Sequence, residues 1–278
     1  MKIDANSVTF EPQDMAFVKK FGILKATEMA LDYHAEHPNL PFLYDAEQLA
    51  GFLGISRGEL NDIVNHIQKE YKEAHLPKKN GTYRSLCVPS IRLRFCQDPI
   101  KEKILPQLPV SKFATAYQKG STTRGNAEPH IGKKFLLKLD ITDFFGSITF
   151  EQVQRTAFNT RYVSRQVGYL LTSLCCKDDS LPQGAATSPA LSNIVMYRFD
   201  DYIGRWCSQR QIAYTRYCDD MTFSANRPLY GVYQKVKTML REMGFELNES
   251  KTHFIGNDNR QSVTGLVVNE KLSIPSSY

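Results

Sequence analysis

The fold of this chain is decided by one stretch near its centre, Ile212-Ala213-Tyr214-Thr215-Arg216-Tyr217-Cys218-Asp219-Asp220-Met221-Thr222-Phe223-Ser224-Ala225. Apolar and aromatic residues on both sides of the acids predict two antiparallel strands joined by a tight turn. Adjacent side chains of a strand face opposite sides, so both carboxylates reach one metal site only if the turn re-aims one of them. We therefore expect unequal roles, with Asp219 the firmer metal ligand and Asp220 the weaker one.

A third carboxylate ends an apolar strand upstream. Residues 135–140 read Phe-Leu-Leu-Lys-Leu-Asp, and a charge buried there without a partner would be costly. Nucleotidyl transfer needs two magnesium ions about 3.5–4 Å apart, and magnesium prefers oxygen ligands. Asp140, Asp219 and Asp220 are therefore candidates for metal-dependent phosphoryl chemistry. The alternative is that Asp219 and Asp220 are solvated turn residues, as we expect for Asp178-Asp179 and Asp200-Asp201.

The N-terminal segment, to about residue 70, has the apolar spacing of helices. One stripe runs over residues 17–34 and another over residues 45–71. The second stripe is interrupted at Gly54–Gly58, where Ser56 is a plausible cap, which predicts two short helices joined by a turn. Such pairs occur in DNA-binding proteins, but we favour a packing role.

Further helices are expected around the two acidic segments. Thr149 and Gln152 form a capping box at the start of one helix. Ser188 is the expected cap of a longer helix with Pro189 at its first position. Residues 233–243 have helical periodicity that Gly244 ends.

Positive charge is concentrated in less than a quarter of the chain. The net charge is +6, yet the segment from Lys72 to Lys134 carries 13 Lys and Arg residues against four acids. Within it, Asn80-Gly81 is a strong signal for a hairpin turn, which predicts a basic β-ribbon. This surface either binds a polyanion or is an ordinary solvated basic surface.

Composition places the chain among globular proteins. A hydrophobic fraction of 42% over 278 residues is sufficient for one large domain or two intimately packed ones. No run approaches the roughly 20 apolar residues of a membrane span, and the N-terminus is polar. We expect a cytoplasmic protein with reduced cysteines and no membrane partner.

Three motifs, in this order, resemble those of reverse transcriptases, most closely the bacterial retron type. Leu139-Asp140-Ile141-Thr142-Asp143-Phe144-Phe145 comes first, Leu181-Pro182-Gln183-Gly184-Ala185-Ala186-Thr187-Ser188-Pro189 follows, and Tyr217-Cys218-Asp219-Asp220 resembles the Tyr-x-Asp-Asp box. The resemblance covers about residues 76–274. Two departures are small: Cys218 replaces the commoner alanine, and Ala186 replaces the usual proline.

The resemblance implies an RNA-directed DNA polymerase with the α+β right-hand fold, in which a four-stranded or similar antiparallel palm sheet is backed by helices. Its expected parts are an N-terminal helical segment (1–75), basic fingers (76–134) and a palm (135–278), with fingers elements also around 155–185. The helical thumb is expected to be largely absent, because the chain stops at Tyr278. Either the chain is truncated, or a partner or folded RNA supplies the clamp.

The resemblance also implies a set of site residues. Asp140, Asp219 and Asp220 would hold two Mg²⁺ ions, for which Mn²⁺ can substitute, with the carbonyl of Ile141 as a helper. Phe145 would be the steric gate that selects deoxynucleotides, unless it is simply a core aromatic. The residues expected at the nucleotide are Lys78, Lys79, Arg84, Asp143, Phe144, Phe145, Gln183, Gly184 and Lys251, of which Arg84 is favoured over either lysine and Lys251 has a solvated alternative.

Two further elements resemble retron sequences that are associated with a structured RNA, Asn126-Ala127-Glu128-Pro129-His130 and Val263-Thr264-Gly265. They make Asn126, His130, Val263, Thr264 and Gly265 candidates for RNA binding, although a structural role for His130 is the equal alternative. The partners implied are a structured noncoding RNA as template and primer, an RNA–DNA duplex, deoxynucleoside triphosphates and an effector protein, in anti-phage defence. Alternatives are another defence-associated or group II intron-like reverse transcriptase, or an RNA-binding palm without activity.

Overall fold

The computed structural model describes residues 1–278 except 5–6, 78–80, 82, 160–162 and 275–278. The chain packs into two compact units. The first unit comprises Met1–Leu108 and Ile148–Leu191, and the second comprises Pro109–Ser147 and Ser192–Tyr278. Helices and antiparallel sheets occur together, which confirms the predicted α+β class.

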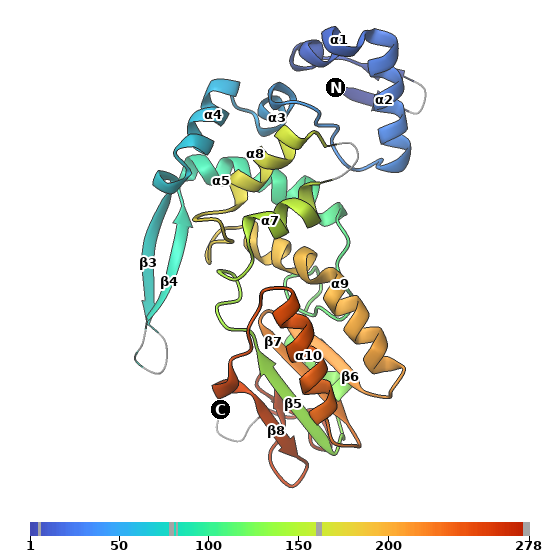
Figure 1. The fold of residues 1–278 in the computed structure, drawn as a ribbon, viewed down its shortest axis with the longest axis vertical. Coiled ribbons are helices and arrows are strands. Elements are labelled where there is room, and N and C mark those ends of the chain that lie inside the picture. Colours follow the sequence, from blue (N-terminus) through green and yellow to red (C-terminus); the bar gives the residue numbers. More distant parts are fainter. Residues whose placement is uncertain (5–6, 78–80, 82, 160–162, 275–278) are drawn as a thin grey trace. The chain divides into compact units, whose positions relative to one another are not determined.

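The first unit is mainly helical (Figure 1). Its α-helices are α1 Met15–Phe21, α2 Ile23–Glu36, α3 Ala46–Leu53, α4 Arg57–Asn65, α5 Ile91–Pro99, α7 Phe150–Val153 and α8 Arg165–Cys175. Its strands form two antiparallel pairs, β1 Lys2–Asp4 with β2 Ser7–Thr9 and β3 Tyr71–Pro77 with β4 Tyr83–Pro89. Shorter helical turns are η1 Pro12–Asp14, η2 Ile67–Glu70, η3 Ile100–Ile104, η4 Leu105–Gln107 and η6 Gln154–Phe158.

The second unit is built on a four-stranded antiparallel sheet of order β6-β7-β5-β8. Its strands are β5 Phe135–Asp140, β6 Ala213–Tyr217, β7 Asp220–Ala225 and β8 His253–Gly256, and a separate hairpin joins β9 Ser262–Val263 to β10 Leu266–Val267. Its helices are α6 Thr123–Ala127, η5 Glu128–His130, α10 Tyr230–Glu242 and η7 Glu249–Lys251, and α9 Ser188–Ser208 begins in the first unit and continues into the second. The predicted four-stranded sheet is thus confirmed.

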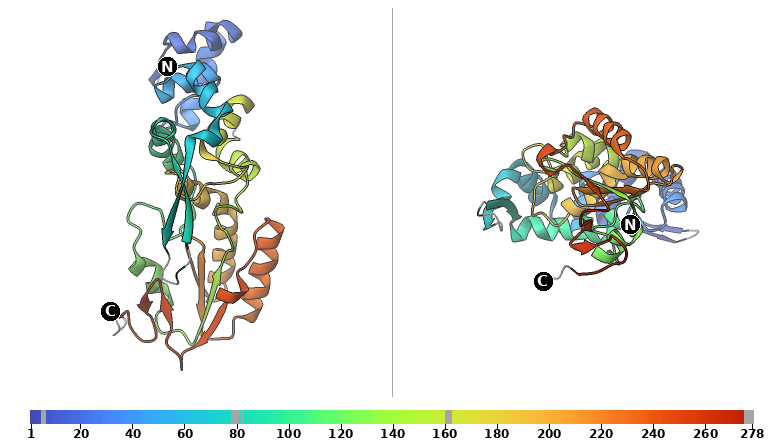
Figure 2. Two further views of the ribbon diagram at one scale, coloured as in Figure 1. Left: turned by 90° about the vertical axis from the view of Figure 1, so that its left-hand side faces the viewer. Right: turned by 90° about the horizontal axis from the view of Figure 1, so that it is seen from below.

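The sheet has two faces of different character. Because strand side chains alternate, Leu137 and Leu139 point to one face of β5, while Lys138 and Asp140 point to the other. Both leucines are fully buried, and Phe223 of the neighbouring strand is buried beside Leu137, its partner in the register. Helix α10 lies on one side of the sheet, and α6 with the β9–β10 hairpin lies on the other (Figure 2).

Some predicted boundaries differ from the structure. The stripe over residues 17–34 is divided between α1 and α2, because Gly22 has φ 78°, a backbone conformation that ends a helix at little cost for glycine. The two helices predicted within 45–71 are confirmed, and the Ser56 hydroxyl accepts from the Glu59 amide at 3.1 Å as the expected cap.

Two helix starts also differ. The prediction that Ser188 caps α9 is wrong, because the helix already includes Ser188, whose hydroxyl donates to the carbonyl of Pro182 at 2.7 Å. The capping box of Thr149 and Gln152 is confirmed, but the α-helix it begins has only four residues before the π-helical turn η6. Helix α10 begins at Tyr230, three residues before the predicted start.

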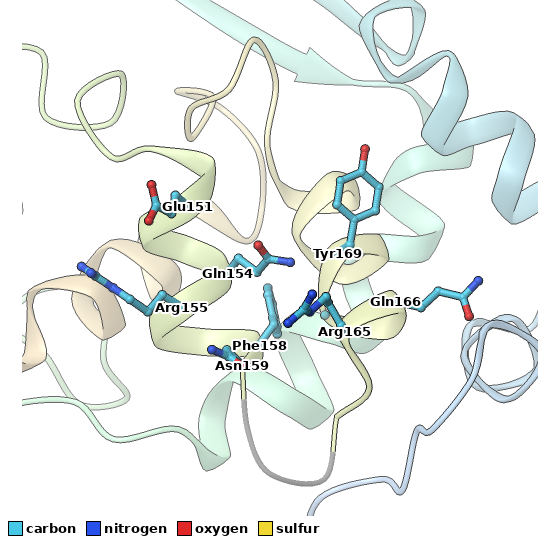
Figure 3. A pocket seen from close by; sticks show the side chains of 9 residues that line it. Glu151, Gln154, Arg155, Phe158, Asn159, Arg165, Gln166 and Tyr169 are labelled. Atoms are coloured by element: carbon cyan, nitrogen blue, oxygen red, sulfur yellow. The ribbon is translucent and has the colours of Figure 1, made fainter.

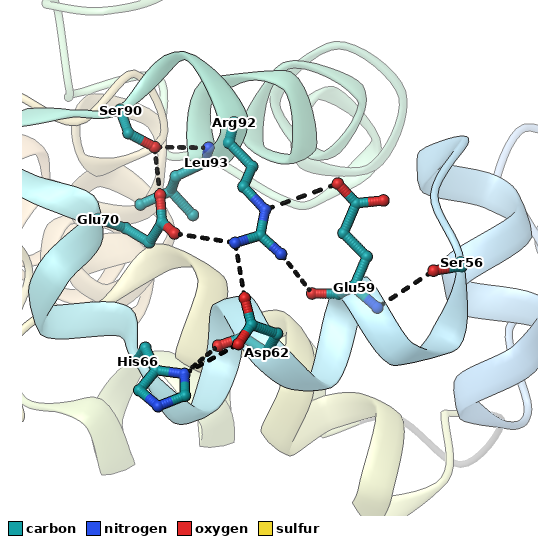
Figure 4. Close-up of polar contacts among 8 residues, drawn as sticks. All are labelled: Ser56, Glu59, Asp62, His66, Glu70, Ser90, Arg92 and Leu93. Atoms are coloured by element: carbon teal, nitrogen blue, oxygen red, sulfur yellow. Dashed lines mark hydrogen bonds and ion pairs between the residues drawn. The ribbon is translucent and has the colours of Figure 1, made fainter.

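The long β3–β4 hairpin is fastened at its root. Glu70 precedes β3, Ser90 follows β4, and the Ser90 amide donates to the Glu70 carbonyl at 2.6 Å while the Ser90 hydroxyl donates to the Glu70 carboxylate. Figure 4 shows Arg92 reaching both Glu70, at 3.4 Å, and Asp62 of α4, at 2.7 Å. The hydrogen bond from Arg92 holds the pKa of Asp62 below its usual range. The hairpin is therefore anchored to α4 and α5, and its basic arm extends from a fixed base.

The loop of Gln183 and Gly184 packs against the same hairpin. The amide of Cys87 in β4 donates to the Gln183 carbonyl at 2.7 Å. Gly184 has φ 122°, and a Cβ atom there would lie 2.8 Å from the Cys87 carbonyl oxygen. Both the conformation and the close approach therefore require glycine.

We expect Gly184→Ala to lower the free energy of unfolding by about 1–3 kcal/mol, because it adds backbone strain to a steric clash. Urea unfolding followed by circular dichroism measures the change. Gly231→Ala is the matched control, since a Cβ atom at that position would have no neighbour within 4 Å and the φ of Gly231 is ordinary. Equal stability of the two variants would contradict the packing described for Gly184.

Candidate active site

The three candidate carboxylates lie together at one end of the central strands of the sheet. Asp140, the last residue of β5, is paired with Asp220, the first residue of β7. Cys218 and Asp219 form the two-residue turn between Tyr217 and Asp220. Asp140 is 5% exposed, whereas Asp219 is half-buried and Asp220 is exposed. Asp220 therefore belongs to a strand, and only Asp219 lies in the turn.

Backbone hydrogen bonds fix this turn against β5. The amide of Ile141 donates to the Asp219 carbonyl at 3.2 Å, and the amide of Asn248 donates to the Asp140 carbonyl at 2.8 Å. Cys218 has φ 60°, a left-handed conformation that is uncommon for a non-glycine residue. A strained residue next to a candidate ligand is consistent with a turn held in place by its surroundings.

The carboxylates share one ammonium group. Lys251 Nζ lies 2.8 Å from Asp140 Oδ2, and this hydrogen bond, with the charges of Asp219 and Asp220, raises the pKa of Lys251. Desolvation and the neighbouring charges of Asp219 and Asp140 raise the pKa of Asp220, against the opposing effects of Lys138 and Lys251. Three carboxylates thus lie near two lysines, Lys138 and Lys251, so the acids outnumber the ammonium groups.

The donor set suits a hard divalent cation. All side-chain donors are carboxylate oxygens, the ligands that Mg²⁺ prefers, and the neighbouring acids contribute, after desolvation, to the raised pKa of Asp220. In the described part of the chain, however, no three His, Cys, Asp or Glu side chains are grouped closely enough to hold a metal ion as they lie. Lys251 occupies one oxygen of Asp140 in this arrangement.

The segment after β5 is tightly wound. Asp143 has φ 43°, and its carbonyl accepts from the Ser147 amide at 2.8 Å. Phe144 is buried, Phe145 is half-buried, and their ring centroids are 5.5 Å apart. Phe144 is therefore part of the core, while Phe145 keeps an accessible surface.

The other candidates for nucleotide binding lie in the first unit. Arg84 is exposed on β4, opposite Leu76 of β3. Gln183 is half-buried and Gly184 is exposed, in the loop that packs on Cys87. Lys78 and Lys79 lie outside the described residues.

The comparison with protein families decides the relationship. Residues 76–268, more than half of the chain, match the family model described as reverse transcriptase (RNA-dependent DNA polymerase). The chain belongs to the reverse transcriptase family.

Curated relatives place it with the retron type. The retron Ec86 reverse transcriptase of Escherichia coli is 29% identical over 89% of this chain and 78% of its own length. The retron Ec83 reverse transcriptase of the same species is 34% identical, over 73% of this chain and 70% of the relative. The retron Mx65 reverse transcriptase of Myxococcus xanthus is 32% identical over 84% of this chain but only 60% of the relative.

Solved structures agree on the fold. Telomerase from Candida albicans, solved with a fragment of telomeric RNA, has a TM-score of 0.52 at 13% identity, covering 75% of this chain and 47% of that one. Apo telomerase from Candida tropicalis has a TM-score of 0.50 at 13% identity, covering 74% and 48%. At this identity the likeness concerns the polymerase fold alone.

In this reverse transcriptase the two retron-like elements pack against each other. The Asn126 amide donates to the Thr264 hydroxyl at 3.4 Å, and Val263 lies in one apolar cluster with Ala127. Thr264 and Gly265 have φ 45° and 83° and form the turn between β9 and β10, which is the geometry of a tight hairpin turn. Asn126 and Val263 are buried, so among the candidates for RNA binding in these elements Thr264 and Gly265 are more accessible than those two.

His130 is buried inside the second unit. Its Nδ1 lies 2.7 Å from Ser224 Oγ of β7, and its Nε2 lies 2.9 Å from Thr215 Oγ1 of β6. Burial, with a smaller effect of the Lys133 charge, lowers the pKa of His130 to about 3. The imidazole is therefore neutral near pH 7 and connects η5 to two strands of the sheet, so it is not accessible to RNA in this arrangement.

A hollow lies elsewhere, in the first unit. It measures about 760 Å³ and lies between α7–η6 and α8 (Figure 3). Gln154, Phe158 and Arg165 are among the residues that line it. None of the candidate site residues lines it. Separately, no helix in the described part of the chain is long and apolar enough to cross a membrane.

In metal-free protein we expect Asp220→Asn to raise the melting temperature near pH 7. The raised pKa means that ionised Asp220 is disfavoured in the fold, so its charge lowers stability above its pKa, and that cost disappears as the pH falls and Asp220 is protonated. Added Mg²⁺ should stabilise the wild type more than the variant.

Differential scanning fluorimetry with EDTA or Mg²⁺, at about pH 7 and about pH 4, measures both effects. Glu270→Gln, at an exposed acid of the same unit, is the control and should change neither. A lower melting temperature for Asp220→Asn without metal would contradict the electrostatic argument.

Proposed function

We propose that this reverse transcriptase copies a structured noncoding RNA into single-stranded DNA by two-metal nucleotidyl transfer at Asp140, Asp219 and Asp220. One observation carries the proposal: Asp140 is paired with Asp220 across the two central strands, next to the turn that holds Asp219. Rigid neighbouring strands can hold such ligands with little reorganisation.

The proposed metal ligands are the three carboxylates, with the carbonyl of Ile141 as a further oxygen donor. When bound, two Mg²⁺ ions would activate the attacking hydroxyl and stabilise the leaving pyrophosphate, and Mn²⁺ could replace them. The side chains determine where this chemistry happens. Lys251 neutralises Asp140 in this arrangement, and its 59% exposed side chain is long enough to turn toward a triphosphate once Asp140 has another cation.

The proposed nucleotide contacts divide by task. Arg84, with Lys78 or Lys79, would bind the triphosphate, because a guanidinium offers a fork of fixed donors to phosphate oxygens. Gln183 and Gly184 would line the pocket, and the hydrogen bond from Cys87 keeps their loop on the hairpin that carries Arg84. Asp143 and Phe144 shape the loop that presents Phe145 to the sugar.

The proposed partner is a folded RNA that serves as template and primer, with the growing RNA–DNA duplex. This rests on the retron relatives and on the basic segment around the hairpin. Asn126, His130 and Val263 are buried. The proposed RNA contacts of the retron-like elements are therefore Thr264 and Gly265. The proposal extends, on the resemblance to the retron type, to a cytoplasmic setting in anti-phage defence with an effector protein.

The first test is incorporation of labelled deoxynucleotides on a primed RNA with Mg²⁺. We expect Asp219→Asn/Asp220→Asn to reduce incorporation at least about 100-fold, because the ligands that orient the reactants are lost. Asp178→Asn/Asp179→Asn, at the exposed adjacent acids of the first unit, is the matched control and should keep wild-type activity. Equal loss in both double variants, or an inactive wild type even with its own structured RNA, would refute the assignment.

A second test addresses the sugar. If Phe145 is the steric gate, Phe145→Ala should lower the preference for deoxynucleotides over ribonucleotides by about tenfold or more, since the ring no longer clashes with a 2′-hydroxyl. Competition between labelled dGTP and GTP measures the ratio. Phe150→Ala, at another half-buried phenylalanine, should leave it unchanged; an unaltered ratio in Phe145→Ala would make Phe145 a core residue only.

A further inference from the structure

Arg216 is an arginine in a place where arginine is rarely found. It lies on β6, two residues before the turn that contains Asp219, and its side chain is completely buried. Arginine is almost never fully buried unless it is paired. Burial alone would lower the pKa of Arg216, but the Coulombic attraction of Asp200, its hydrogen bonds and smaller neighbouring effects together outweigh burial and raise it. The guanidinium is therefore charged inside the core.

Every part of the guanidinium has a partner in the second unit. Nε and Nη2 donate to the two oxygens of Asp200 on α9, at 3.0 and 2.6 Å, and Nη2 also donates to Asn193 Oδ1 at 3.0 Å. Tyr214 donates its hydroxyl to Asp200 at 2.7 Å. The remaining nitrogen, Nη1, donates to the carbonyl of Cys218 at 2.8 Å. One rigid group thus connects helix α9 to the turn.

Stability alone is a weak reason for this arrangement. Replacing a buried ion pair by apolar residues of similar volume is often neutral or stabilising, because two charges no longer have to be desolvated. The Nη1 contact offers another reason. It holds the carbonyl of the strained residue Cys218, at φ 60°, and so determines the direction in which the next residue, Asp219, leaves the turn.

The same guanidinium also lies over the ring of Phe144, with its central carbon 5.7 Å from the ring centroid. Phe144 in turn contacts Phe145, the candidate steric gate. The position of Arg216 therefore affects both the metal-binding turn and the residue proposed to select the sugar. The two segments are 73 residues apart in the sequence, counted from Phe145 to Cys218.

We propose that Arg216 is a positioning residue that aligns the Asp219 turn for metal binding and supports Phe145 through Phe144. The inference rests on the proposed function for the roles of Asp219 and Phe145. It assigns no contact between Arg216 and substrate, since the side chain has no exposed surface.

The test replaces the buried polar cluster by apolar residues, in the triple variant Asp200→Leu/Tyr214→Phe/Arg216→Met. This change removes the tie to Cys218 while leaving neither a buried charge nor the Tyr214 hydroxyl without a partner. Asp201→Asn/Arg205→Gln is the matched control, because it removes the exposed ion pair of the same helix, 3.0 Å long. Circular dichroism and thermal melting establish that each protein is folded.

Metal affinity is the deciding measurement, made without nucleotide by Mn²⁺ electron paramagnetic resonance. We expect the folded triple variant to bind Mn²⁺ about 10- to 100-fold more weakly than the wild type, the usual effect of losing a group that orients metal ligands. The control should match the wild type. Where incorporation is measurable, the triple variant should need more Mg²⁺ for half-maximal rate and discriminate less against ribonucleotides.

Wild-type Mn²⁺ affinity in the folded triple variant would overturn the proposal. If that variant does not fold, Arg216→Lys decides by the same measurement, since one ammonium can pair with Asp200 but cannot also reproduce the fork to Asn193 and Cys218. Weaker Mn²⁺ binding by folded Arg216→Lys supports the positioning role, and unchanged binding overturns it. An inactive wild type would refute the polymerase function, whereas Mn²⁺ affinity would still decide the role of Arg216.

Discussion

The register of β5 against β7 is the constraint on which the candidate site depends. It pairs Asp140 with Asp220, and the hydrogen bond from Ile141 to the carbonyl of Asp219 extends the alignment into the turn. A slip of one residue would turn Asp140 toward the leucine face of the sheet, because strand side chains alternate. Leu137, buried on that opposite face, would be turned over by the same slip, so its burial disfavours that slip.

The charged pairs on the two faces of this sheet differ in their burial. On the face with Asp140, Lys251 is largely exposed and pairs with a carboxylate that has other acids beside it, so the pair can exchange with an incoming cation. On the opposite face, Arg216 and Asp200 are both completely buried and are held by several hydrogen bonds. The exposed pair of Lys251 and Asp140 suits binding and release of a cation. The buried contacts of Arg216 suit alignment, and one of them reaches the turn at Cys218.

Much of this arrangement could be predicted from short-range sequence patterns. The apolar and aromatic residues on both sides of the acids predicted the strands, and the family motifs predicted the carboxylates and the polymerase fold. Partners in the tertiary structure were harder to predict, and Arg216 was missed. The prediction that Asp200 is solvated is wrong, because its carboxylate is completely buried and paired with the guanidinium of Arg216. A signal did exist, since Arg216 has the same strand parity as the buried Ile212 and Tyr214. The break at Gly22 was missed because the apolar stripe continues across this residue, whose φ of 78° separates α1 from α2.

The two retron-like elements show that residues of a family motif can lie inside the fold. Asn126 and His130 are buried polar groups whose hydrogen bonds join α6 and η5 to the sheet and to the β9–β10 hairpin. A buried, satisfied polar network defines one arrangement of its elements, because any other leaves groups without partners. The neutral state of His130 keeps that network free of charge near pH 7. The structural role of these residues therefore involves no contact with RNA: Asn126 donates to Thr264 in the left-handed turn, and His130 connects η5 to the sheet.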